Sequence, residues 1–229
     1  MTTPPLAVVT DIEGTTTRIA FVHDVLFPYA RARLPAFLAA RAGDEDVAAV
    51  LAEVTRLAPD APPLETLLAW IDADAKITPL KTLQGLIWAE GYESGALRGE
   101  LYPDVAPALR RWHAAGTRLY VYSSGSEAAQ RQLFGHAQDG DLTGLFSGFF
   151  DTRVGAKREA ASYAAIAHAA CLERGSALFL SDVGAELDAA AAAGWRTCQL
   201  VRPQDGTAPA EGHAQAADFD DVGRLFSLS

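Results

Sequence analysis

Residues 6–16 read LAVVTDIEGTT, and this stretch sets the fold that the rest of the chain is expected to adopt. It opens with an apolar run rich in β-branched side chains, which predicts a short strand buried on both faces, as in parallel sheets. The run ends on Asp11, and Glu13 follows two residues later. The stretch therefore predicts a buried parallel strand with two carboxylates beyond its carboxyl end.

A long helical segment follows this strand, from residue 21 to about residue 97. Apolar residues recur in it at helical spacing, and breaks at residues 43–44, 59–63 and 78–79 divide it. Its pattern contains no strand. Four helices in succession predict an all-α unit inserted after the first strand.

Strands and helices alternate in the remainder of the chain. Such alternation is typical of right-handed βαβ units on a parallel sheet. We therefore expect an α/β fold, with a doubly wound parallel-sheet core formed by residues 1–16 and 103–229 and an inserted all-α cap at residues 17–102. The expected strands cover residues 118–122, 147–151, 177–180 and 195–201, and the expected helices cover residues 105–115, 127–136, 158–174 and 185–193, with one more near the end of the chain.

Composition narrows the class of protein. The chain has 229 residues, 49% of them hydrophobic, and a formal net charge of −10. This apolar content without a long apolar run excludes a disordered chain and a membrane-spanning one, and the negative charge argues against nucleic-acid binding. The two cysteines lack a CxxC spacing, and the start of the sequence lacks a signal-peptide pattern. Both features predict a cytoplasmic protein.

Carboxylates follow two of the expected strands. Asp11 and Glu13 come after the first strand, and Asp182 comes after the strand at residues 177–180. Ligands of open α/β sheets bind beyond the carboxyl ends of the strands, and Mg²⁺ takes one or two carboxylates together with phosphate oxygens. These residues therefore indicate a metal site. The sequence leaves open the alternative that Asp11 and Asp182 only cap a turn and a helix and that Glu13 is solvated.

Hydroxyls and a lysine occupy similar places. Ser123 and Ser124 lie between the strand at residues 118–122 and the next helix, where hydroxyls and helix-start amides form an anion cradle. Lys157 is one of three lysines and is expected at the start of a helix, against the helix dipole, which indicates an ammonium directed at an anion. The alternatives are an ordinary helix N-cap for the segment at residues 123–126 (SSGS) and a solvated surface position for Lys157.

Taken in chain order, the acid pair, hydroxyl, lysine and acid resemble the four motifs of the haloacid dehalogenase superfamily of phosphatases, and the helical segment resembles the cap domain of that superfamily. Residues 11–16 (DIEGTT), 121–126 (VYSSGS) and 179–183 (FLSDV) are similar to the enolase-phosphatases, or acireductone synthases, of methionine salvage. Glu13 stands where most of the superfamily has Asp, and Ser181 stands where this family is expected to have Thr. The likeness extends over nearly the whole chain.

The resemblance implies an activity. It implies a magnesium-dependent, bifunctional enolase-phosphatase that converts a phosphorylated diketone, 2,3-diketo-5-methylthiopentyl-1-phosphate, to the acireductone 1,2-dihydroxy-3-keto-5-methylthiopentene and phosphate. We expect a monomer that binds this small molecule, without a nucleic-acid or membrane partner. Two alternatives remain open: a generic capped phosphatase for small sugar or alkyl phosphates, and a non-catalytic α/β module whose acidic strand ends are only caps.

The resemblance also implies roles for the site residues. Asp11 would be the nucleophile that takes the phosphoryl group, and Glu13 would be the general acid for the leaving oxygen. One Mg²⁺ would be held by Asp11, Asp182 and Glu13, the last through its side chain or its backbone carbonyl. The phosphate would be bound by Ser123, Ser124 and Lys157, of which the lysine also neutralises charge beside the nucleophile.

Overall fold

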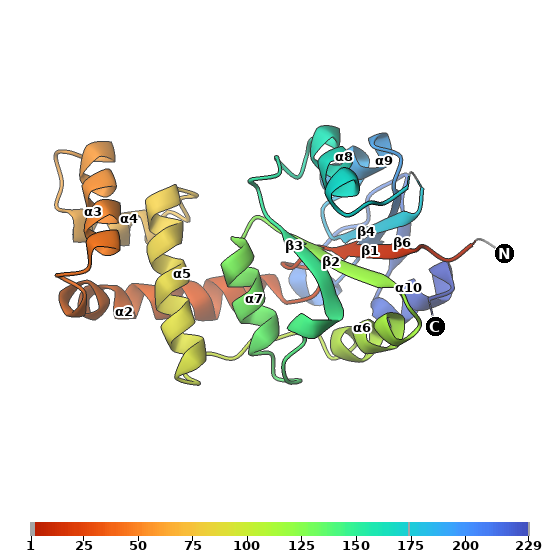
Figure 1. The fold of residues 1–229 in the computed structure, drawn as a ribbon, viewed down its shortest axis with the longest axis horizontal. Coiled ribbons are helices and arrows are strands. Elements are labelled where there is room, and N and C mark those ends of the chain that lie inside the picture. The colour runs from red at the N-terminus through yellow and green to blue at the C-terminus, as the bar shows by residue number, and fades with distance from the viewer. Residues whose placement is uncertain (1–2, 174, 229) are drawn as a thin grey trace. The chain divides into compact units, whose positions relative to one another are not determined.

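The computed structural model describes residues 3–173 and 175–228, and residues 1, 2, 174 and 229 lie outside this described part. The described part divides into two compact units (Figure 1). One unit comprises the chain up to Ile19 together with the chain from Arg98 onward, and the other comprises Ala20–Leu97. The first unit contains all the strands of the described residues, and the second is helical.

The first unit is built on a parallel sheet. Within the described residues the sheet has six strands in the order β3-β2-β1-β4-β5-β6, and each neighbouring pair is parallel. Successive strands are added outward from β1 in both directions, which confirms the predicted doubly wound sheet. The strands are β1 (Ala7–Thr10), β2 (Arg118–Tyr122), β3 (Phe146–Phe150), β4 (Ala177–Ser181), β5 (Arg196–Leu200) and β6 (Ala214–Ala216).

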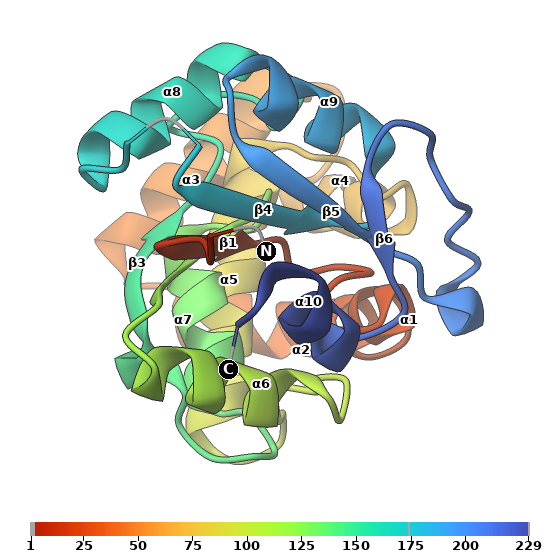
Figure 2. The same cartoon turned by 90° about the vertical axis from the view of Figure 1, so that its right-hand side faces the viewer.

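Helices cover both faces of this sheet, so that all four residues of β1 are buried. Figure 2 shows α8 and α9 on one face and α6, α7 and α10 on the other. No helix in the described part of the chain combines the length and the apolar character needed to cross a membrane. The helices of this unit are α6 (Val105–Ala114), α7 (Glu127–Gly135), α8 (Ala160–Ala169), α9 (Gly184–Ala192), α10 (Phe219–Phe226) and the 3₁₀ turns Thr143–Leu145 and Pro203–Asp205.

The register of the central strands determines where the site lies. Thr10, the last residue of β1, pairs with Val121 of β2 and with Leu180 of β4. The residues that follow along these three strands therefore reach the same edge of the sheet. Because the strands are parallel, this is their carboxyl edge, with Asp11 at its centre.

The second unit has a core of its own. Buried leucines from three different helices, Leu34, Leu67 and Leu83, belong to it. Trp88 is partly buried and packs against this core. Its Nε1 donates to the carbonyl of Leu26 (2.8 Å), and its ring stacks on Phe27. The helices here are α1 (Ile19–Phe21, which begins in the first unit), a π-helix (Val22–Leu26), α2 (Phe27–Ala40), α3 (Glu45–Leu57), α4 (Pro63–Asp72) and α5 (Thr78–Glu93).

The structure corrects three expectations about individual elements. The tail contains the strand β6, which pairs with β5 through backbone groups although its sequence, AQA, has no apolar pattern. A π-helix over Val22–Leu26 interrupts the expected α-helix. The helix expected at residues 158–174 spans Ala160–Ala169, because the backbone turns at Cys171 (φ +50°); residue 174 lies outside the described residues.

Candidate active site

Asp11 lies where the central strand ends. Its backbone N–H donates to the carbonyl of Leu180 (2.9 Å), which ties it to β4. Its side chain is 6% exposed, Oδ1 accepts the N–H of Ile12 (2.7 Å), and Oδ2 lies 2.7 Å from Nζ of Lys157. A carboxylate held at both oxygens keeps one orientation, as a nucleophile aimed at a bound substrate requires.

Lys157 bridges two carboxylates. Its side chain is 9% exposed, and Nζ lies 2.7 Å from Oδ2 of Asp11 and 2.6 Å from Oε2 of Glu186. Burial alone would lower the pKa of Lys157, but the charges of Asp11 and Glu186 and the hydrogen bonds to them raise it above its usual value. Lys157 is therefore a buried ammonium and not a solvated surface side chain. It lies in a turn before α8, which begins at Ala160, rather than directly at the start of a helix as expected.

Glu186 completes this group, although sequence reasoning did not select it. It lies in the first turn of α9, is 9% exposed, and accepts a hydrogen bond from the hydroxyl of Ser181 (2.9 Å). The hydroxyl of Ser181 in turn accepts the N–H of Val183 (3.1 Å). In the sequence, only its position four residues after Asp182 indicates that Glu186 could lie at the site. An acidic residue at that position is equally common in the solvated first turn of a helix.

Ser181 offers a test of this arrangement. We expect Ser181→Ala to lower the free energy of unfolding by roughly 1–2 kcal/mol, because the Glu186 carboxylate and the Val183 N–H each lose a buried partner. Ser181→Thr keeps the hydroxyl and is expected to retain most of the stability. Urea unfolding measures both variants, and equal losses in the two would contradict a role for the hydroxyl.

Asp182 packs against the loop that follows β1. Gly14 has a φ of +67°, and a Cβ at this position would lie 2.5 Å from Oδ2 of Asp182, so glycine leaves the room that the carboxylate occupies. Burial and the charge of Asp11 raise the pKa of Asp182 to about 7. Asp11 and Asp182 therefore repel each other at one edge of the sheet, an arrangement that a bound divalent cation would stabilise.

These residues fit a magnesium ion, since Mg²⁺ takes one or two carboxylates and completes its shell with water and phosphate oxygens. Among residues 3–173 and 175–228, no three His, Cys, Asp or Glu side chains form a metal-binding cluster, so the side chains of Asp11, Glu13 and Asp182 do not form one. Glu13 is half-buried and forms an isolated backbone bridge with Thr17. The structure thus brings the two aspartates together, and the role of Glu13 as a ligand stays a prediction.

The two serines lie beyond β2. Ser123 is buried, and its hydroxyl accepts the N–H of Gly125 (3.3 Å), whereas Ser124 is exposed. The N-cap of α7 is Ser126, whose hydroxyl accepts a backbone N–H of the first turn (3.3 Å). The ordinary helix N-cap that the alternative expected in residues 123–126 is therefore present, and it is formed by Ser126 rather than by Ser123 or Ser124. Their predicted role in binding phosphate is not tested by these contacts.

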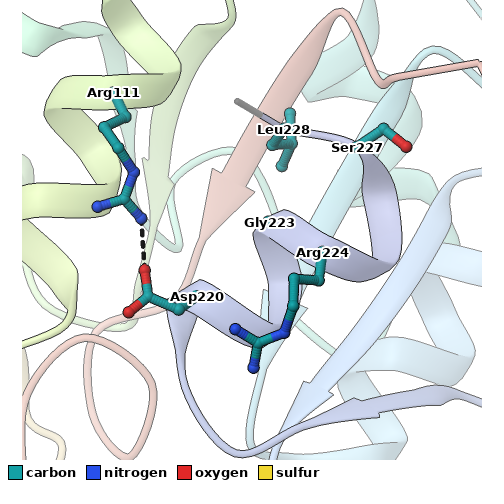
Figure 3. Close-up of a pocket in the computed structure, with 6 residues that line it drawn as sticks. All are labelled: Arg111, Asp220, Gly223, Arg224, Ser227 and Leu228. Carbon is teal, nitrogen blue, oxygen red and sulfur yellow. Dashed lines mark hydrogen bonds and ion pairs between the residues drawn. The ribbon is translucent and has the colours of Figure 1, made fainter.

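A pocket of about 600 Å³ lies elsewhere in the first unit, beside α6 and α10 (Figure 3). Arg111 on α6 forms an ion pair there with Asp220 on α10, so charge in the pocket is partly neutralised by the protein itself. Its lining is formed by Arg111, Asp220, Gly223, Arg224, Ser227 and Leu228. None of these six is a predicted site residue, and the carboxyl edge of the sheet remains the candidate active site.

Comparison with known proteins identifies the family. Residues 5–194 match the model of the haloacid dehalogenase-like hydrolases. The chain is 62% identical to Enolase-phosphatase E1 of Gluconacetobacter diazotrophicus, over 97% of this chain and 94% of that protein. It is 59% identical to Enolase-phosphatase E1 of Acidiphilium cryptum, over 99% of this chain and 97% of that protein. The chain belongs to the enolase-phosphatase E1 family of haloacid dehalogenase-like hydrolases.

Membership of the enolase-phosphatase E1 family confirms the resemblance inferred from the motifs. The fold agrees as well, because the crystal structure of the Unknown transcript 4 protein of Saccharomyces cerevisiae matches with a TM-score of 0.80. That protein is 35% identical, and the match covers 94% of this chain and 99% of that one. Phosphatases of this hydrolase family generally depend on Mg²⁺, which agrees with the paired aspartates.

Proposed function

We propose that this chain is a bifunctional enolase-phosphatase that converts 2,3-diketo-5-methylthiopentyl-1-phosphate to the acireductone 1,2-dihydroxy-3-keto-5-methylthiopentene and inorganic phosphate in methionine salvage. The observation that carries the substrate is the similarity to two Enolase-phosphatase E1 proteins over nearly their whole length. The phosphatase chemistry is supported independently by the contact between Asp11 and the Lys157 ammonium at the carboxyl edge of the sheet.

The hydrolytic half-reaction begins at Asp11. A carboxylate oxygen of Asp11 attacks phosphorus, an aspartyl phosphate forms, and the bond between phosphorus and the substrate oxygen breaks. Glu13 gives a proton to that leaving oxygen. Water then attacks phosphorus and gives a proton to the Glu13 carboxylate, which releases inorganic phosphate and restores both the Asp11 carboxylate and the protonated Glu13. Each step is a displacement at phosphorus, so alignment and charge determine its rate.

The surrounding residues stabilise the charge that moves in these steps. Lys157 lies 2.7 Å from Oδ2 of Asp11 and neutralises negative charge as the carboxylate meets the phosphate. Glu186 also contacts the Lys157 ammonium (2.6 Å) and helps to keep it in place. Ser123 and Ser124 bind the remaining phosphate oxygens. Lys157, together with the proposed Mg²⁺, thus supplies the positive charge that a phosphate needs in a chain whose net charge is −10.

One Mg²⁺ per chain completes the proposed site. Asp11 and Asp182 would hold it through their carboxylates and Glu13 through its backbone carbonyl, because the three side chains form no metal-binding cluster in the described residues. When bound, it would supply positive charge to the phosphate and ketone oxygens. The room for Asp182 beside Gly14 and the repulsion between Asp182 and Asp11 support this assignment. The helical unit serves as the cap, inserted after the strand that carries the nucleophile.

We also propose that the enzyme acts as a monomer in the cytoplasm. Both cysteines, exposed Cys171 and buried Cys198, are free thiols in the described structure, as a reducing compartment favours. Light scattering of the purified protein should give a mass close to 24.3 kDa. A mass near twice that value would contradict the proposed monomer.

A substrate panel tests the proposed activity against the generic phosphatase. With Mg²⁺ present, we expect kcat/KM for the diketo phosphate to exceed that for sugar phosphates and p-nitrophenyl phosphate by a factor on the order of 10² or more. Similar values across the panel would favour the generic capped phosphatase. No turnover of any ester would favour the non-catalytic module.

Gly14→Ala is expected to disturb the site. The new Cβ would overlap Asp182, and the backbone would keep a left-handed conformation that costs an L residue about 1–2 kcal/mol. Displacement of an active-site group by about 1 Å can lower the reaction rate roughly 10²-fold. We therefore expect kcat for phosphate release to fall by at least about tenfold. Steady-state assay and thermal unfolding of the same preparation separate the two effects.

Gly140→Ala is the matched control for this variant. Gly140 also has a positive φ (+93°), but a Cβ there would meet no atom within 4 Å. We expect it to lose stability while its kcat remains that of the parent. An equal fall in kcat for both variants would contradict the specific role of Gly14.

A further inference from the structure

The turn that carries Lys157 is held through its backbone carbonyls. Residues 155–157 present three consecutive carbonyl oxygens, and each accepts a hydrogen bond from a side-chain hydroxyl. The donors come from the end of β2 and from the first turn of α8. The three pairs are Tyr122 Oη with Gly155 (2.9 Å), Ser162 Oγ with Ala156 (2.7 Å) and Tyr163 Oη with Lys157 (2.7 Å).

All three donors are buried, since Tyr122 and Tyr163 are 0% exposed and Ser162 is 1% exposed. Burial raises the pKa of both phenols, so each keeps the proton that it donates. Loss of a tyrosine hydroxyl would leave the carbonyl of Gly155 or Lys157 without the hydroxyl that it accepts, whereas the carbonyl of Ala156 also accepts the N–H of Glu159 (3.1 Å).

The backbone of the turn is fitted closely to these donors. Gly155 has a φ of +138°, and a Cβ at that position would lie 2.2 Å from Oγ of Ser162. The turn also explains why α8 begins at Ala160, after Lys157. In a helix that began at Lys157, the carbonyl of Lys157 would accept a backbone N–H one turn later, whereas here it accepts the hydroxyl of Tyr163.

Fixing this turn determines where the ammonium lies. The hydroxyl bonds hold the main chain at Lys157 and at the two residues before it, while Asp11 and Glu186 hold Nζ at the other end of the side chain. A long, flexible side chain is thereby restrained at both ends. Restraint before the substrate arrives lowers the cost of orienting the charge during reaction.

We propose that Tyr163, together with Tyr122 and Ser162, is a positioning residue of the phosphatase reaction that acts through Lys157 by fixing the backbone of residues 155–157. None of the three needs to touch the substrate. The proposal rests on the proposed function, because it assumes that Lys157 takes part in phosphate release.

Removing single hydroxyls tests the proposal. We expect Tyr163→Phe and Tyr122→Phe each to lower kcat for phosphate release by roughly 5- to 10-fold, with a smaller change in KM. A loss of this size corresponds to the free energy of one buried hydrogen bond. Tyr120→Phe is the matched control. Tyr120 belongs to the same buried cluster, but its hydroxyl donates to none of the three carbonyls. Equal losses in all three variants, or none in Tyr163→Phe, would overturn the proposal.

A double-mutant cycle with Lys157→Ala separates positioning from general destabilisation. If Tyr163 acts through Lys157, Tyr163→Phe should lower the residual kcat of Lys157→Ala by less than about twofold, because coupled residues are not additive. A merely structural role would give the same fold-loss in both backgrounds. That result would overturn the proposal even if the enzyme is an enolase-phosphatase.

A spectroscopic readout does not depend on turnover. The chain has three lysines, so labelling lysine with ¹³C at Cε gives three resonances, and Lys157→Ala assigns one of them. We expect Tyr163→Phe to shift or broaden the Lys157 resonance and Tyr120→Phe to leave it unchanged. An unchanged resonance in Tyr163→Phe would overturn the proposal, whereas a shifted resonance in a protein without phosphatase activity would mean that the proposed function failed instead.

Discussion

Asp11→Asn is expected to abolish phosphate release, with a loss of kcat on the order of 10³-fold or more, the scale seen when other enzymes lose their nucleophile. Asparagine keeps a carbonyl oxygen that can accept the Ile12 N–H, but its amide cannot attack phosphorus. It also removes one of the two negative charges beside Lys157. We therefore expect the variant to fold and to bind the substrate without forming an aspartyl phosphate.

The measurement is a single-turnover assay of inorganic phosphate with enzyme in excess, beside circular dichroism of the same sample. Asp218→Asn provides the control, because Asp218 caps α10 and asparagine is an equally good cap. We expect this control to keep full activity. Full phosphate release by Asp11→Asn would rule out Asp11 as the nucleophile.

Lys157→Met is expected to damage both stability and activity. Without the ammonium, Asp11 and Glu186 become two buried like charges, and losing one partner of a buried ion pair typically costs about 3–5 kcal/mol. Activity should fall by a factor on the order of 10² or more, because charge beside the nucleophile is no longer neutralised. Urea unfolding and steady-state assays measure the two losses.

A second substitution separates these effects. Lys157→Met with Glu186→Gln removes one of the two like charges, so we expect it to regain part of the stability but none of the activity. The stability deficit of Lys157→Met should also shrink at lower pH, where protonation of a carboxylate relieves the repulsion. Recovered phosphate release in the double variant would contradict a catalytic role for Lys157.

The location of the site could be predicted because parallel strands end at one edge. Asp11, Ser123 and Asp182 each come at or just after the end of a strand whose apolar run is visible in the sequence. The strand order brings them close together, because β2 and β4 each pair with β1. The scarcity of lysine in this chain singles out Lys157, but Lys157 lies in a turn before α8 and not at the start of a helix as expected.

The remaining features depend on contacts that no local pattern encodes. Glu186 looks like an ordinary acidic residue in a first helical turn, and its contact with Lys157 appears only when β4 and α9 are placed beside the turn at residues 155–157. Tyr122 and Tyr163 have the spacing of core aromatics, and they are core residues. Their hydroxyls also donate hydrogen bonds to the turn at residues 155–157, which the spacing does not indicate. The strand β6 forms through backbone hydrogen bonds to β5, which almost any sequence can make.

We propose that this one chain both enolises and dephosphorylates the diketo phosphate. The most direct measurement follows enediol absorbance and inorganic phosphate together, from one sample of 2,3-diketo-5-methylthiopentyl-1-phosphate, with Mg²⁺ and with EDTA. With Mg²⁺, we expect each molecule of substrate to yield one molecule of phosphate and one of acireductone, and we expect EDTA to suppress both products. Release of phosphate with no enediol, at any Mg²⁺ concentration, would contradict it.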